Sequence, residues 1–138
     1  MGTTTIEYRL LPGTRASVGR AEVHHVIADR PEGKAGGMGL GFNGGELLAL
    51  AIGGCFCNDV EAIADEMGVR LADLQVSVSI DFDGAPSRAT SVRMEVDCKL
   101  EDSVDSSALI ERAKRLTTIG NSVRAGIPLE IEATNGRA

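Results

Sequence analysis

The sequence predicts one α+β domain in which antiparallel strands surround a long buried helix. Residues 44–67 form a continuous helical segment, and its first half is apolar on every face. Two segments, 76–82 and 92–100, alternate apolar and polar residues, as strands with one buried face do. Turn-forming residues between them predict a hairpin. Because 138 residues suit one hydrophobic core, we expect a single domain over residues 1–138.

Three short strands are expected before the helix, over residues 3–10, 15–18 and 20–29. The first two are separated by Leu11-Pro12-Gly13, a sequence typical of a turn. Residues 30–43 contain a proline and repeated glycines, which favour turns over regular structure. We therefore expect a long loop that leads the chain into the helix.

The helix carries local signals at both ends. Asn43 and Glu46 stand three residues apart, which predicts a capping box, and Gly68 suits a left-handed C-cap. From Asn58 onward the helix is amphipathic, and four residues are expected to face inward: Val60, Ile63, Ala64 and Met67. Residues 47–56 are apolar all round and need cover on every side. One modest sheet and one further helix cannot provide it, so we expect a second copy of the chain to do so.

A second helix and a last strand are expected in the remaining chain. Residues 102–107 are rich in helix N-cap residues. Apolar residues at helical spacing then form one stripe: Leu109, Ala113 and Leu116. Gly120 and Asn121 are expected to interrupt this helix. Residues 127–133 alternate apolar and polar side chains and predict a strand, and Pro128 favours an edge position or a strand start.

The composition is that of a soluble globular protein, with 43% hydrophobic and 25% charged residues. A net charge of −6 would repel a phosphate backbone, so nucleic acid is not an expected partner. Residues 1–11 contain no apolar run of signal-peptide or membrane-spanning length. We expect a cytoplasmic protein without a membrane partner. With three Phe, one Tyr and no Trp, aromatic stacking platforms are scarce, and no cofactor is expected.

The three cysteines, Cys55, Cys57 and Cys98, would remain thiols in a reducing cytosol. Cys57 points about 200° away from Cys55 around the helix and is not a facile disulfide partner. Cys98 lies on the apolar face of its strand and is expected in the core. A metal site of the first two cysteines with His24 and His25 is not expected, because adjacent strand residues face opposite ways.

Two stretches of the chain carry a resemblance to a known family. They are residues 43–55, NGGELLALAIGGC, and residues 113–128, AKRLTTIGNSVRAGIP. The first is similar to the helix start of the OsmC family, which includes the organic hydroperoxide resistance proteins, and ends at the family's cysteine position. The second resembles the family's other characteristic stretch, where a Cys-Pro pair normally occupies Thr117 and Thr118. The resemblance implies an intertwined homodimer with active sites at the dimer interface.

By this resemblance Cys55 is the peroxidatic cysteine, which attacks a hydroperoxide as a thiolate and becomes a sulfenic acid. In characterised family members a second cysteine then closes a disulfide. Thr117 stands at that resolving position in this chain, so the resolving cysteine is missing. The departure bears on the mechanism and leaves the expected fold unchanged.

The thiolate also needs a cation, because Asp59 lies one helical turn after Cys55 and disfavours negative charge on the sulfur. Three arginines are candidates for this role: Arg15, Arg20 and Arg124. The first fits the family's early-strand arginine loosely, the second is the fallback, and the third belongs to the second matching stretch. Glu46 matches a family glutamate, but it lies roughly 13 Å along the helix axis from Cys55. Capping explains Glu46 better than catalysis does.

These residues support two functional hypotheses. The first is a one-cysteine peroxidase of the oxidative stress response, which reduces organic hydroperoxides through Cys55 and is recycled by an external thiol. The alternative is a member without peroxidase activity, which binds a small apolar or thiol-bearing ligand in the dimer-interface pocket.

Overall fold

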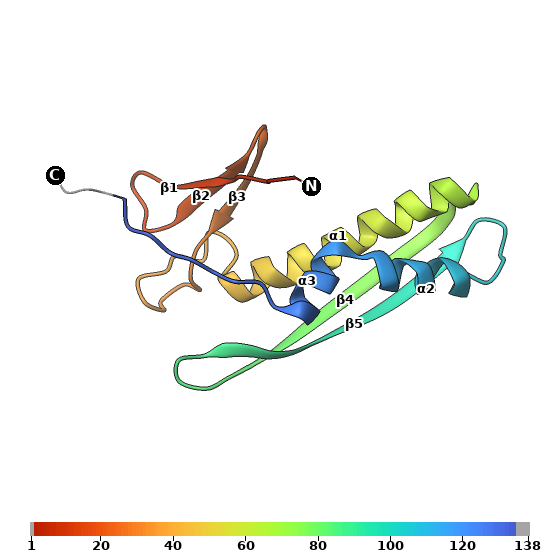
Figure 1. The fold of residues 1–138 in the computed structure, drawn as a ribbon. Coiled ribbons are helices and arrows are strands. Elements are labelled where there is room, and N and C mark those ends of the chain that lie inside the picture. The colour runs from red at the N-terminus through yellow and green to blue at the C-terminus, as the bar shows by residue number, and fades with distance from the viewer. Residues whose placement is uncertain (1, 135–138) are drawn as a thin grey trace. The chain divides into compact units, whose positions relative to one another are not determined.

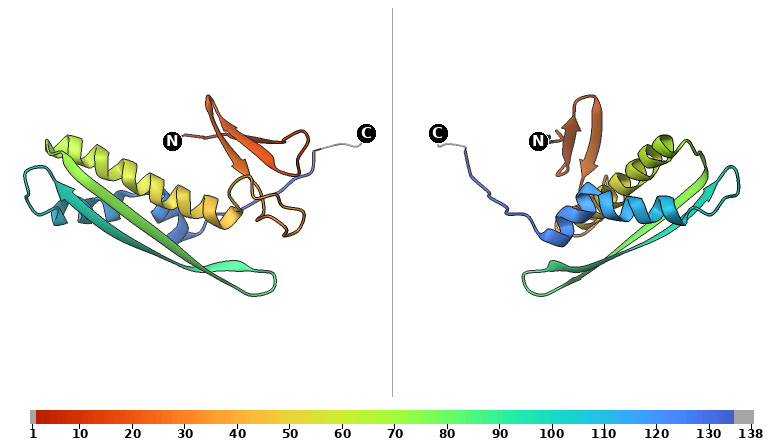
Figure 2. Two further views of the ribbon diagram at one scale, coloured as in Figure 1. Left: turned by 180° about the vertical axis from the view of Figure 1, so that it is seen from behind. Right: turned by 45° about the vertical axis from the view of Figure 1, so that its right-hand side comes forward.

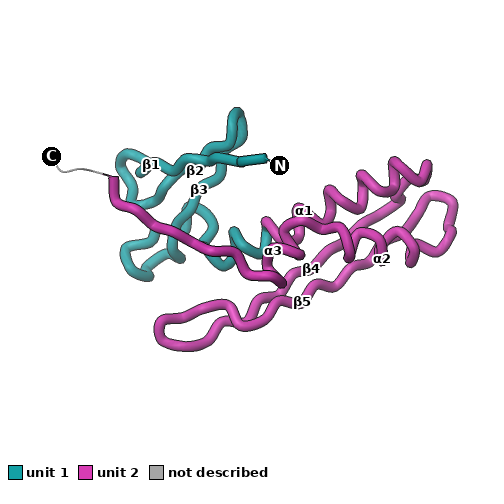
Figure 3. The backbone as a smooth tube through the Cα atoms, in the orientation of Figure 1, with its two compact units in different colours: residues 1–50 teal, residues 51–138 magenta. Residues whose placement is uncertain are grey.

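The computed structural model describes residues 2–134, and the chain divides after Leu50 into two compact units (Figure 3). The first unit holds strands β1 (Glu7–Leu10), β2 (Ser17–Ala21) and β3 (His24–Ala28). They form an antiparallel sheet in the order β1-β2-β3. The long helix α1 (Gly44–Met67) begins at the end of this unit and continues into the second. The mixed α+β architecture with antiparallel sheets and a long helix confirms the predicted fold class (Figure 1).

The first and third strands are shorter than predicted, the second lies further along the chain than residues 15–18, and the boundary between the second and third was wrong. Arg20 lies on β2, opposite His25 of β3, and does not begin the third strand. The chain reverses between them through Glu22, whose φ of 55° is in the left-handed region. A tight turn at this point was not signalled, since Glu is not a residue that favours positive φ.

The loop between β3 and α1 is organised around the buried carboxylate of Asp29. This side chain accepts hydrogen bonds from the backbone N–H groups of Arg30 at 2.7 Å, Met38 at 3.1 Å and Leu40 at 3.0 Å. The Leu40 bond is the largest cause that lowers the pKa of Asp29 below its ordinary value of 3.8, and burial opposes it. The sequence predicted an irregular loop here, and the hydrogen bonds to the Asp29 carboxylate fix the conformation of that loop.

Helix α1 has the predicted ends because both caps are local. The N–H of Asn43 donates to Glu46 Oε1 and the N–H of Glu46 donates to Asn43 Oδ1, each at 2.9 Å. Gly68 follows the last turn with φ of 70°. By length and hydropathy alone α1 could cross a membrane, but the core helix of a soluble protein passes the same test.

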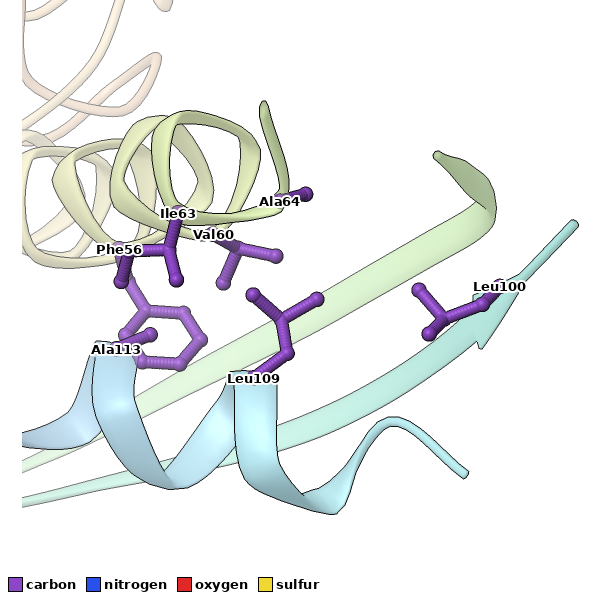
Figure 4. Close-up of a cluster of buried hydrophobic side chains, with 7 residues drawn as sticks. All are labelled: Phe56, Val60, Ile63, Ala64, Leu100, Leu109 and Ala113. Carbon is purple, nitrogen blue, oxygen red and sulfur yellow. The ribbon is translucent and has the colours of Figure 1, made fainter. Parts of the chain in front are cut away.

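The second unit is built on a long antiparallel ribbon of β4 (Leu71–Asp83) and β5 (Arg88–Leu100). Helices α1, α2 (Ser107–Leu116) and α3 (Thr118–Ala125) lie on one side of this ribbon (Figure 2). Both strands extend beyond the predicted segments. The buried cluster between helices and ribbon confirms most of the predicted core (Figure 4): Phe56, Val60, Ile63, Ala64, Leu100, Leu109 and Ala113.

Three predictions in this unit were wrong. The second helix breaks at Thr117, and Gly120 and Asn121 lie inside α3. Met67 is exposed, because it is the last helical residue and the ribbon does not cover it. Residues 127–133 form no strand, and no neighbouring strand among residues 2–134 pairs with them.

Candidate functional site

The sulfur of Cys55 lies between a hydroxyl and a carboxylate. Cys55 is half-buried near the middle of α1. Its Sγ donates to Oδ2 of Asp59, one turn further along the helix, at 3.7 Å. The hydroxyl of Thr117 donates to the same Sγ at 3.9 Å. The structure thus brings together the two residues that the resemblance assigns to the peroxidatic and resolving positions.

Thr117 reaches Cys55 from the junction of α2 and α3. Its backbone N–H donates to the carbonyl of Ala113 at the end of α2, and its carbonyl accepts from Asn121 at the start of α3. Extended backbone torsions, φ −61° and ψ 112°, separate the two helices. The side chain is 4% exposed. The helix break therefore places a buried threonine against the thiol.

A cavity of about 670 Å³, within the size range of small-molecule sites, lies against Thr117, whereas Cys55 is not among its lining residues. Thr117 lines it, and so do Ile52 and Phe56, which belong to the same part of α1 as Cys55. Six further lining residues have apolar side chains: Ala89, Val92, Met94, Val96, Ile110 and Val123. Lys114 and Arg124 supply the cationic groups of the lining. The space suits an apolar molecule with a polar end.

The three candidate arginines differ in their contacts and in whether they line the cavity. Arg124 lines the cavity, and its Nη1 donates to Oδ1 of Asn121 at 2.7 Å and to the carbonyl of Lys114 at 3.5 Å. Arg15 and Arg20 belong to the first compact unit and are exposed. The guanidinium of Arg15 lies over Gly36, where an added Cβ would collide with it. Of the three, Arg124 is the one that lines the cavity shared with Thr117.

The other predicted residues are explained by helix capping, in the case of Glu46, and by burial, in the case of Cys57 and Cys98. Glu46 forms the reciprocal cap described above. Burial raises the pKa of the Cys57 thiol. Burial also raises the pKa of Cys98, which packs against the core as predicted, and nearby carboxylates act in the same direction. Within residues 2–134, no three His, Cys, Asp or Glu side chains gather in a way that could hold a metal ion.

Sequence reasoning missed the part that Gly120 plays. A Cβ on this residue would lie 2.6 Å from Cγ2 of Thr117, so only glycine leaves room for the threonine methyl group. The glycine three residues after Thr117 was interpreted as a helix interruption, although it could have indicated a tightly packed junction. The cavity lining from β5 and α2 carried no local signal, because it depends on contacts distant in sequence.

A long helix that carries a half-buried thiol and packs on an antiparallel two-stranded ribbon places the chain among mixed α+β proteins. The family model described as OsmC-like protein matches residues 36–132. The chain belongs to the OsmC-like family, as the sequence resemblance indicated.

Solved structures share this fold. An OsmC-like protein from Mycoplasma pneumoniae superposes with a TM-score of 0.74 at 12% identity, covering 91% of this chain and 89% of that one. An organic hydroperoxide resistance protein OsmC from Legionella pneumophila gives 0.62 at 16% identity, covering 90% of each chain. The organic hydroperoxide resistance protein OhrB of Bacillus subtilis gives 0.59 at 19% identity, covering 91% and 93%. No curated protein sequence is significantly similar to this chain.

Proposed function

We propose that this protein is a one-cysteine, thiol-dependent peroxidase that reduces organic hydroperoxides through Cys55. The observation that carries the proposal is the contact of the Cys55 sulfur with the hydroxyl of Thr117, a residue that lines a largely apolar cavity. An apolar cavity favours an organic hydroperoxide over hydrogen peroxide, because burial of the apolar organic group stabilises the complex. The names of the Legionella and Bacillus relatives support the same substrate class.

The reaction has two balanced steps. The Cys55 thiolate attacks the terminal peroxide oxygen, so that an S–O bond forms, the O–O bond breaks and the alkoxide leaves as the alcohol after taking a proton. One thiol of an external reductant then displaces water from the sulfenic acid, and a second thiol releases Cys55 and forms the reductant's disulfide. Thr117 cannot form a disulfide, which is why the second step needs an external thiol.

The proposal includes a cytoplasmic homodimer. On α1, the side chain of Leu50 is 51% exposed and an added Cβ on Gly54 would meet nothing within 4 Å. This apolar face of the helix is open in the single chain. A second copy of the chain would cover it.

One observation favours the alternative, in which the cavity binds a small apolar or thiol-bearing ligand without turnover. Asp59 accepts from the Cys55 thiol at 3.7 Å, and a carboxylate at this position favours the neutral thiol over the thiolate. A neutral thiol reacts slowly with peroxides.

The experiment that separates the two functions is stopped-flow mixing of the reduced protein with cumene hydroperoxide, followed by dimedone trapping and mass mapping. We expect a sulfenic acid on Cys55 and turnover when dithiothreitol is supplied. The Cys55→Ser variant should lose both signals, whereas Cys57→Ser and Cys98→Ser should keep them. Full activity in Cys55→Ser, or no oxidation of Cys55 under any condition, would reject the peroxidase.

A further inference from the structure

The hydroxyl of Thr117 has an unusual partner for its position in the fold. Thr117 is the N-cap residue of α3, where a threonine side chain normally accepts a hydrogen bond from the backbone of the first turn. It makes no such bond here. Within residues 2–134, the one polar side-chain partner of this hydroxyl is Sγ of Cys55 at 3.9 Å. The threonine forgoes the stabilisation of a helix cap and contacts the thiol instead.

Burial makes this contact more than incidental. Thr117 is 4% exposed, and a buried hydroxyl without a hydrogen-bond partner is costly. Gly120 also restricts the side chain, because Cγ2 of Thr117 occupies the space where a Cβ would stand, 2.6 Å away, while Oγ1 lies further from that point at 3.6 Å. The methyl group is therefore held against α3, and the hydroxyl remains available to the sulfur.

We propose that Thr117 is the hydrogen-bond donor that stabilises the Cys55 thiolate, a role this chain assigns to the position where a resolving cysteine is missing. The sulfur's catalytic task rests on the proposed function, but the hydrogen bond can be tested without it. In the attack on a hydroperoxide, the Thr117 proton stays on its oxygen. The donor stabilises negative charge on sulfur before the S–O bond forms.

The charged groups around the sulfur define what the hydroxyl must offset. On α1 itself, Asp59 accepts the thiol proton and opposes ionisation. From α2 and α3, Lys114 and Arg124 line the cavity that Thr117 also lines, and both carry positive charge. On the ribbon side of α1, Val76 and Val78 lie against Gly53, which points about 200° away from Cys55 around the helix. Thr117 is thus the neutral donor in contact with a sulfur that also faces a carboxylate.

The test is the pH profile of iodoacetamide alkylation at Cys55, resolved by mass mapping so that the other thiols do not contribute. A hydrogen bond to the charged form shifts a titration by roughly 0.5–1 pH unit, so Thr117→Val should move the midpoint upward by about that amount. The alkylation rate below the midpoint should fall about 3- to 10-fold. Thr117→Ser keeps the hydroxyl and should restore the wild-type profile.

Thr118→Val is the matched control, since the neighbouring Thr118 is exposed and should leave the profile unchanged. Thr117→Ala provides a second variant without a hydroxyl, and circular dichroism checks that each variant is folded. A Thr117→Val or Thr117→Ala profile that matches the wild type would overturn the proposal. A loss in Thr117→Ser as large as in Thr117→Val would overturn it as well, because packing and not the hydroxyl would then matter.

The readout keeps this inference separate from peroxidase activity. An upward shift without any reaction with cumene hydroperoxide would support the hydrogen bond and reject the peroxidase. An unchanged profile in a chain that does reduce cumene hydroperoxide would reject the role of Thr117 and leave the peroxidase intact.

Discussion

At the scale of single residues, Cys55 has two neighbours that act on its charge in opposite directions. Thr117 donates to the sulfur, and Asp59 accepts from it. Which neighbour dominates decides whether the thiol reacts at neutral pH, because only the thiolate is nucleophilic. Removal of each neighbour should therefore change the reactivity of Cys55 with opposite sign.

The first prediction concerns Asp59→Asn. Loss of the carboxylate removes a nearby negative charge, so the alkylation rate of Cys55 at pH 7 should rise about 3- to 10-fold. Iodoacetamide alkylation with mass mapping measures it. Glu61→Gln, exposed on the same helix, is the control and should change the rate little. A slower reaction in Asp59→Asn would mean that the carboxylate orients the thiol, contrary to the charge effect.

The second prediction concerns Thr117→Cys, which should form a disulfide with Cys55 after treatment with cumene hydroperoxide. The Oγ1 and Sγ atoms are 3.9 Å apart, and a bond of about 2.05 Å requires them to approach by roughly 2 Å. A longer C–S bond and side-chain rotation provide part of this movement. The new disulfide should also protect Cys55 from overoxidation to the sulfinic acid.

Peptide mapping under non-reducing conditions measures this link. Thr118→Cys is the control, and its exposed side chain should give little bridge to Cys55. Absence of the bridge in Thr117→Cys, while Cys55 is demonstrably oxidised, would show that residue 117 cannot take the resolving role.

At the scale of elements, α1 contains two adjacent glycines with different surroundings. A Cβ on Gly53 would lie 3.0 Å from Cγ2 of Val78 on β4, whereas a Cβ on Gly54 would meet nothing within 4 Å. Alanine is favoured over glycine by about 1 kcal/mol inside a helix. In the single chain this gain is available at Gly54, but at Gly53 the contact with β4 offsets it.

The third prediction follows from this difference. In urea unfolding, Gly54→Ala should be more stable than Gly53→Ala by up to about 1 kcal/mol. The comparison is made at high dilution, where the proposed dimer dissociates, because a second copy packed on Gly54 would turn the gain into a loss. Equal stability of the two variants at high dilution would contradict the close approach of β4 to α1.

The loop before α1 provides a prediction about pH. The pKa of Asp29 is lowered by the backbone N–H of Leu40 first, and by those of Arg30 and Met38. Its contribution to stability is therefore present above the ordinary value of 3.8 and is lost as the pH falls through the lower folded value. Hydrogen-exchange protection of the Met38 and Leu40 amides should fall in that acid range.

Asp29→Asn should already have weak protection at pH 7, and its protection should no longer depend on this titration. Asp83→Asn removes an exposed hairpin carboxylate that accepts from the N–H of Gly84, and it should leave the loop amides unchanged. Protection in Asp29→Asn equal to that of the wild type would show that the loop does not depend on the carboxylate.

The same elements show what the sequence could predict. Both ends of α1 were predicted because Asn43, Glu46 and Gly68 act within one turn of the helix they bound. The break at Thr117 was missed because no local residue pattern marks it, and the residue that Thr117 contacts, Cys55, lies 62 residues earlier. The alternating pattern of residues 127–133 suits a strand, but a strand also requires a partner, and alternation does not say which chain supplies it.

At the scale of the whole molecule, apolar side chains remain exposed where the sequence indicates burial. Leu50 on α1 is 51% exposed. In the last described segment Ile127, Leu129 and Ile131 are 73%, 82% and 88% exposed. Scattered exposed apolar residues are ordinary. An exposed apolar helix face together with an alternating segment that pairs with no strand among residues 2–134 is typical of a subunit that packs against another copy. The protein should therefore be a homodimer in solution.

Multi-angle light scattering should give a mass of twice the chain mass of 14.4 kDa at micromolar concentration. Leu50→Glu should dissociate this dimer. Burial of one leucine contributes about 2 kcal/mol, and a symmetric dimer carries the substitution twice, so association should weaken roughly 10³-fold. Val23→Glu is the matched control, because Val23 is 79% exposed in the turn between β2 and β3 and should leave the mass unchanged. A stable monodisperse wild-type monomer at micromolar concentration would contradict the dimer, and the exposed face of α1 would then need another occupant.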